Sequence, residues 1–422
     1  MDFLRENVNT LAKSIDYFYF PLRTLLFYNN HDLYNVFIIL IKGEVLHLIM
    51  KEKTTIIIAG IVIGIIAVAL VVLGNPANMG YCIACFLRDI AGGLGLHRAG
   101  VVQYLRPEIM GLVLGAFATA FMFKEFKSTG GSGFMLRFFL GVFMMMGALI
   151  FLGCPWRLLL RLAGGDLNAL VALPGYIFGI WVGVLFLRQG YTLGPAGNQP
   201  RLNGWVGPLL AVGLLILVIA APAFIFFSEE GPGSMRAPLF VSLLAGLLVG
   251  ILAQRTRFCT MGAFRDILIF RDFHLFSGIA ALFIVALIGN LVTGSFSLGF
   301  LNQPVAHTDS VWNFLSMGVV GLAAVLAGGC PLRQLILSGE GNGDATATVL
   351  GLIVGAAIMH NFGWAGSPAG APVGGQIMIV VVWLILLGIG FSITRQALVE
   401  SQKKAKAQQE KSGQNVEPTQ AG

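Results

Sequence analysis

The chain has 422 residues, of which 56% are hydrophobic and only 11% are charged, with a mean hydropathy of +0.82. Soluble domains carry about 25% charged residues, and a water-soluble fold could not bury this much apolar surface. The formal charge of +7 comes from basic residues in short loops and a C-terminal tail. Positive-inside orientation explains that pattern better than nucleic-acid binding does, so the composition excludes a soluble protein and indicates a membrane protein.

Ten apolar segments are long enough to be transmembrane helices, because about 20 residues cross a bilayer core of roughly 30 Å. They are predicted near residues 54–74, 107–123, 133–152, 168–187, 204–227, 237–253, 276–296, 312–328, 346–362 and 374–394. If the N-terminus is inside, almost every lysine lies in a cytoplasmic loop or tail. We therefore predict a multi-pass protein of the cell (plasma or inner) membrane with both termini cytoplasmic.

The two ends of the chain differ from this pattern. Residues 1–49 are mixed in character, and Met50 stands directly before Lys51 and the first strong span. We predict that residues 1–49 are an upstream misread or a dispensable extension. Residues 395–422 are rich in Gln, Lys, Ser and Pro, which predicts a disordered cytoplasmic tail.

Two motifs recur at nearly one offset and predict an internal duplication. Residues 81–90 align without a gap with residues 258–267, and Cys, Arg, Asp and Ile are identical in register. The pattern Gly-Cys-Pro-x-Arg occurs at 153–157 and again at 329–333. We predict membrane repeats at 50–227 and 228–394. An odd number of crossings per repeat would make the second copy inverted in the membrane.

Each motif lies in a segment that is too short, too glycine-rich and too charged to cross the bilayer. These segments are residues 79–95, 154–166, 256–270 and 330–344. We predict that they are re-entrant half-helices, which are tolerated only where they are buried in protein or line a cavity. The fold class is therefore an all-α integral membrane protein of about ten transmembrane helices, in two inverted-topology repeats with re-entrant half-helices.

The motif residues are the candidates for function. In Gly-Cys-Pro the proline suits the first helical position, which places the cysteine at a helix N-terminus and favours an anion. The predicted substrate pathway comprises Cys82, Cys154, Cys259, Cys330, Arg88, Arg265, Arg157 and Arg333. Pairing or structural roles are predicted for Asp89, Asp266, Pro155 and Pro331. Cys85 matches Gly262 in the second motif, so it is predicted to be a packing residue.

Other interpretations stay open at this point. The cysteines could be small buried apolar residues, and the Arg-Asp pairs could only lock the short helices in place. Cys82 and Cys85 could form a membrane thiol-disulfide oxidoreductase, and the thiolates together could line a soft-metal channel, although the arginines would repel a cation. No Walker loop, dinucleotide fingerprint or HExxH occurs, and the histidines lack ligand spacing. We predict no enzyme activity, metal or cofactor.

The doubled Phe/Tyr-Cys…Arg-Asp and Gly-Cys-Pro-x-Arg patterns resemble the YeeE/YedE family of sulfur-transport membrane proteins over about residues 50–394. Within that family the chain is most similar to YedE-related proteins associated with selenium metabolism. The resemblance implies import of a small sulfur- or selenium-containing anion, such as thiosulfate, passed along cysteines. Cys82 and Cys154 would serve the outer vestibule, and Cys259 and Cys330 the inner one. A small cytoplasmic sulfur or selenium carrier is an open candidate partner, and no nucleic acid is expected.

Overall fold

The structure, a computed structural model, describes residues 52–414, and the predicted extension over residues 1–49 lies outside them. Ten helices in this range are long and apolar enough to cross a membrane. They are α4 (Glu52–Val72), α6 (Pro107–Met122), α7 (Phe134–Phe151), α9 (Leu167–Arg188), α10 (Arg201–Ala220), α11 (Leu239–Thr256), α13 (His274–Val292), α14 (Ser310–Ala327), α16 (Gly343–Asn361) and α17 (Val373–Gln414). The prediction of an all-α membrane protein with about ten spans is confirmed.

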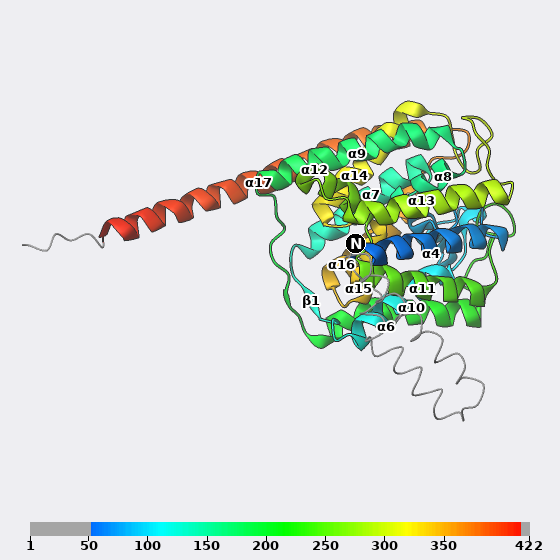
Figure 1. The fold of residues 1–422 in the computed structure, drawn as a ribbon, viewed down its shortest axis with the longest axis horizontal. Coiled ribbons are helices and arrows are strands. Elements are labelled where there is room, and N and C mark those ends of the chain that lie inside the picture. The colour runs from blue at the N-terminus through cyan, green and yellow to red at the C-terminus, as the bar shows by residue number, and fades with distance from the viewer. Residues whose placement is uncertain (1–51, 415–422) are drawn as a thin grey trace, which may run out of the picture. The chain divides into compact units, whose positions relative to one another are not determined.

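Two helix ends differ most from the predicted ones. Helix α10 ends at Ala220 and not near residue 227. Ala221 has a φ of 42°, and Pro222 follows it without an N–H group to continue the helix. Helix α17 continues to Gln414 (Figure 1), whereas composition predicted disorder from residue 395. Its last part is rich in Ala, Gln, Glu and Lys, which have high helix propensity even when they do not pack against a core.

Four short helices lie in the four segments that interrupt the long ones. They are α5 (Ile83–Gly93), α8 (Pro155–Ala163), α12 (Thr260–Phe270) and α15 (Pro331–Gly339). At about 1.5 Å per residue each reaches roughly half of a bilayer core. The remaining elements are the 3-10 turn η1 (Gly100–Val102) and the antiparallel strands β1 (Thr129–Gly130) and β2 (Gly197–Asn198).

Glycines allow the long helices to pack closely in pairs. Helix α6 contacts α11, α7 contacts α16, and α9 contacts α14. Helix α4 lies along α13 (Figure 1), and a Cβ on Gly60 would clash with the backbone of Gly278. Small residues at such contacts are the usual means by which membrane helices approach each other. Further close approaches of this kind involve Gly111, Gly246, Gly141, Gly351, Gly179 and Gly318.

These pairings match those that a duplicated fold would show. In the two predicted repeats, α4 corresponds to α11, α6 to α13, α7 to α14 and α9 to α16. The contact between α4 and α13 therefore corresponds to the contact between α11 and α6. In the same way, the contact between α9 and α14 corresponds to the contact between α16 and α7. Asp166 and Asn342, which occupy matching positions, cap α9 and α16 and bridge to Gly299 and Thr129. The inverted repeat stays a prediction, and the pairings support it.

The short helices all pack against long helices of the other predicted repeat. Helix α5 packs on α16 and α8 on α13, while α12 packs on α9 and α15 on α6. The cysteine motifs therefore lie between the two predicted repeats.

Candidate substrate pathway

Each of the four repeat-matched cysteines is the N-cap of a short helix. Cys82 precedes α5 and its Sγ accepts a hydrogen bond from the Cys85 N–H at 3.3 Å. Cys259 precedes α12 in the same way, with the Gly262 N–H at 3.3 Å. Cys154 and Cys330 precede α8 and α15, whose first residues are Pro155 and Pro331. The position predicted from Gly-Cys-Pro is confirmed, and all four thiols lie at helix ends with partial positive charge.

The four thiols form two pairs. Cys82 Sγ lies 3.9 Å from Cys154 Sγ, and we call these two residues the first thiol pair. Cys259 Sγ lies 3.6 Å from Cys330 Sγ, and these form the second thiol pair. All four side chains are buried, and none is in a disulfide. The structure thus brings together the two motifs of each predicted repeat, with one thiol pair in each.

Cys85 adds a third thiol to the first pair. Its Sγ lies 2.8 Å from Cys82 Sγ. The guanidinium of Arg157 is also close, because its Nη1 lies 3.8 Å from Cys85 Sγ. Gly262 stands at the matching position of the second repeat, so the second pair has no third thiol. Cys85 therefore contacts the candidate site, and its packing role stays a prediction.

Arg157 places a positive charge beside the first pair. Its guanidinium donates hydrogen bonds to the carbonyls of Asn78 and Pro304, each at 3.2 Å, and of Val305 at 3.3 Å. It also donates to the carbonyl of Leu152. The side chain is fully buried, and within residues 52–414 it has no carboxylate partner. A buried guanidinium without a counter-ion is costly, so this position favours an anion.

The other three predicted arginines have carboxylate partners. Arg88 Nη2 lies 2.7 Å from Asp89, and Arg265 Nη2 lies 2.8 Å from Asp266. These partners were expected from adjacency in sequence. Arg333 instead pairs with Glu340 at 3.2 Å. Of the four, Arg157 is thus the one whose charge is free to act on a substrate.

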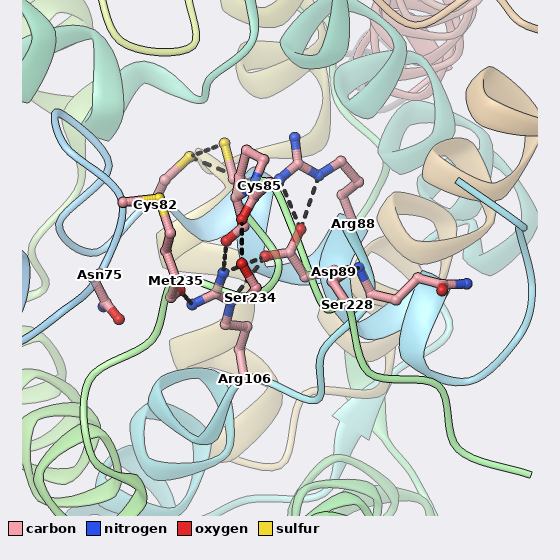
Figure 2. Close-up of polar contacts among 12 residues, drawn as sticks. Asn75, Cys82, Cys85, Arg88, Asp89, Arg106, Ser228, Ser234 and Met235 are labelled. Carbon is pink, nitrogen blue, oxygen red and sulfur yellow. Dashed lines mark hydrogen bonds and ion pairs between the residues drawn. The ribbon is translucent and has the colours of Figure 1, made fainter. Parts of the chain in front are cut away.

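Sequence reasoning missed Arg106, which completes a buried network (Figure 2). Its Nη2 lies 2.7 Å from the carboxylate oxygen of Asp89 that Arg88 does not use. Arg106 also donates to the carbonyls of Pro232 at 2.8 Å and Met235 at 3.0 Å. Through Arg106, Asp89 of α5 is therefore connected to the segment that precedes α11. The one signal in the sequence was an arginine directly before the proline that begins α6.

Two aromatic residues, each next to a cysteine motif, pack on each other. Trp156, two residues after Cys154, packs edge to face on Phe258 with ring centroids 5.7 Å apart. Phe258 directly precedes Cys259, and both rings are buried. The sequence did contain one indication that Trp156 is special. Position x of Gly-Cys-Pro-x-Arg is Trp156 in the first motif and Leu332 in the second.

Within the described part of the chain, no histidine side chain is hydrogen-bonded to a cysteine thiol. His97 stacks on His360 with ring centroids 4.5 Å apart, and its Nε2 contacts the carbonyl of Arg88 at 3.1 Å. Burial lowers the pKa of His97, and burial likewise lowers that of His307. Both are therefore neutral near pH 7. Among residues 52–414, no three or more His, Cys, Asp or Glu side chains are grouped to hold a metal ion.

Ten apolar helices around short, thiol-capped helices define a polytopic membrane protein. Residues 255–421 match the family model described as Sulphur transport. The chain is also similar to the thiosulfate transporter TsuA of Spirochaeta thermophila, with 38% identity over 103 residues, or 24% of this chain and 31% of that protein. It is 28% identical to the thiosulfate transporter TsuA of Escherichia coli over 127 residues, or 30% of this chain and 36% of that protein.

The matched segments thus span about a third of each of these curated relatives. Together with the family match, they confirm the predicted resemblance to the YeeE/YedE sulfur-transport family.

Proposed function

We propose that this protein imports a small sulfur-containing anion across the cell membrane, with thiosulfate as the first candidate substrate. The observation that carries the proposal is the first thiol pair beside Arg157, a buried guanidinium that has no carboxylate partner among residues 52–414. Both curated relatives are named thiosulfate transporters. Their names and the geometry of this site favour the same class of substrate.

The proposed path joins the two thiol pairs. Thiols are soft, polarisable groups that suit a terminal sulfur atom, and two helix N-termini at each pair favour negative charge. Arg157 adds a full positive charge at the first pair. The second pair has the same capped helices but a half-buried arginine paired with Glu340, so it holds an anion less strongly. A decreasing attraction along the path would let the anion leave.

Orientation and selenium are further parts of the proposal. If the N-terminus is cytoplasmic, the first pair serves the outer side and the second pair the inner side, as an inverted repeat requires. Selenium anions are an alternative cargo, because selenium is also soft and polarisable. A small cytoplasmic sulfur or selenium carrier would then accept the product.

A second candidate function has one observation in its favour. Cys82 Sγ and Cys85 Sγ lie 2.8 Å apart, close enough for a thiol-disulfide oxidoreductase that oxidises both thiols to one disulfide and passes on two electrons and two protons. The second thiol pair has no such neighbour, and an oxidoreductase would leave Arg157 without a role. Transport therefore accounts for more of the site.

Uptake by purified protein in proteoliposomes tests the proposed function. Vesicles containing the protein should accumulate labelled thiosulfate faster than protein-free vesicles, and unlabelled thiosulfate should compete. Parallel assays with labelled selenite and selenide decide between sulfur and selenium cargo. Uptake of none of these anions, from protein that elutes as a single folded species, would contradict the proposal.

A further inference from the structure

The indole N–H of Trp156 is a buried hydrogen-bond donor that has no partner among residues 52–414. Its side chain is 1% exposed, and its indole N–H meets no acceptor within the described part of the chain. Buried polar groups are nearly always paired, and an unpaired one lowers the stability of the fold. A donor that no other residue of the described chain uses is available to a ligand.

The position of Trp156 lies on the proposed path. It is in the first turn of α8, two residues after Cys154 of the first thiol pair. Its ring packs against Phe258, which directly precedes Cys259 of the second pair. Helices α8 and α12 contact each other as well. The two rings therefore join the segments that carry the two thiol pairs.

The matching residues of the other repeat do not offer such a donor. Leu332 stands at the position of Trp156 and has no polar group. Tyr81 stands at the position of Phe258, and its hydroxyl already donates to the carbonyl of Glu108. The unpaired N–H thus occurs in the first predicted repeat and not at the matching position of the second. A single donor is sufficient if the anion binds to it at one point of the proposed path.

We propose that the indole N–H of Trp156 binds the oxygen end of the anion between the two thiol pairs, and that Trp156 determines specificity. The proposal rests on the proposed transport function. Thiosulfate has a soft terminal sulfur, which suits the thiols, and three oxygens that accept hydrogen bonds. With the terminal sulfur at a thiol pair, the oxygens can accept from the indole.

Trp156→Phe tests this directly, because it removes the N–H and keeps an aromatic ring. A hydrogen bond to a charged ligand is lost, so the KM for thiosulfate uptake should rise about 10-fold. The melting temperature should stay the same or rise, since the N–H has no hydrogen-bond partner among the described residues. A merely structural tryptophan would show the opposite pattern, with lower stability and an unchanged KM.

Trp383→Phe is the matched control. Its indole N–H donates to the Leu315 carbonyl at 2.9 Å, so this variant should lose stability while keeping the KM of the parent. Trp156→Leu copies the second repeat and also removes the ring, so it should take up sulfate faster than the parent does. An unchanged KM in Trp156→Phe would overturn the inference. Failure of the parent itself to take up thiosulfate would instead contradict the proposed function.

Discussion

Cys82→Ser is expected to reduce thiosulfate uptake about 10- to 100-fold, the effect of losing one hydrogen bond to a charged ligand. Serine has nearly the same shape and still caps α5, because its hydroxyl can accept the Cys85 N–H that Cys82 Sγ accepts at 3.3 Å. The fold should therefore persist, whereas the soft sulfur contact is lost. Initial uptake rates in proteoliposomes measure the effect, with the melting temperature as a check of folding. Cys259→Ser should behave alike if both pairs belong to one path.

Cys85→Ser is the matched control for this experiment. The second thiol pair has Gly262 at the corresponding position, so a third thiol is not needed for the proposed transport. Uptake should stay close to that of the parent. Equal loss in both variants, together with a redox-dependent mobility shift that reveals a disulfide between Cys82 and Cys85, would favour the oxidoreductase.

Arg157→Gln is expected to have the second large effect, with uptake reduced at least about 10-fold. It removes the buried charge that attracts the anion to the first pair. It also leaves carbonyls that Arg157 now contacts, those of Asn78, Pro304 and Val305, short of donors. An unpaired carbonyl costs about 1–3 kcal/mol when it is buried, as that of Asn78 is, and less when it is partly buried, so the free energy of unfolding should fall as well. Uptake as a function of thiosulfate concentration separates a raised KM from loss of folded protein.

Two further variants separate charge from structure. Arg157→Lys keeps the charge without the planar fork, so it should retain more uptake than Arg157→Gln. Arg333→Gln makes the matching change in the second repeat, where the guanidinium is half-buried and paired with Glu340. It should affect uptake less. Equal uptake by Arg157→Gln and the parent would show that the buried charge has no part in binding.

Much of the fold could be predicted because length and apolarity determine membrane-spanning helices. All ten spans and all four short helices lie where the sequence placed them. The exceptions depend on local chemistry, since Pro222 ends α10 early and good helix formers extend α17. Which helices pack together was not predictable from apolarity. It depends on glycines such as Gly179 and Gly318, whose backbones touch.

The site could be predicted only as far as the repeat made it visible. Four cysteines and four arginines were found because they recur at matching positions. Several partners of these residues come from elsewhere in the chain and do not recur at matching positions of the two repeats, so the sequence did not reveal them. Arg106 reaches Asp89 from the start of another helix, and Phe258 packs on Trp156 across the two predicted repeats. Likewise, the sequence could not show that Arg157 forms no ion pair with a carboxylate of the described residues, because ion pairing depends on the folded structure.

Protection of the thiols by substrate tests the central claim most directly. A small membrane-impermeant thiol reagent should label the first thiol pair from the outer side and the second pair from the cytoplasmic side. Thiosulfate should slow the labelling of at least one cysteine in each pair, and sulfate should not. Variants that keep a single cysteine assign each reaction to its residue. Labelling of both pairs from one side, or rates that thiosulfate leaves unchanged, would show that the thiols do not form the path.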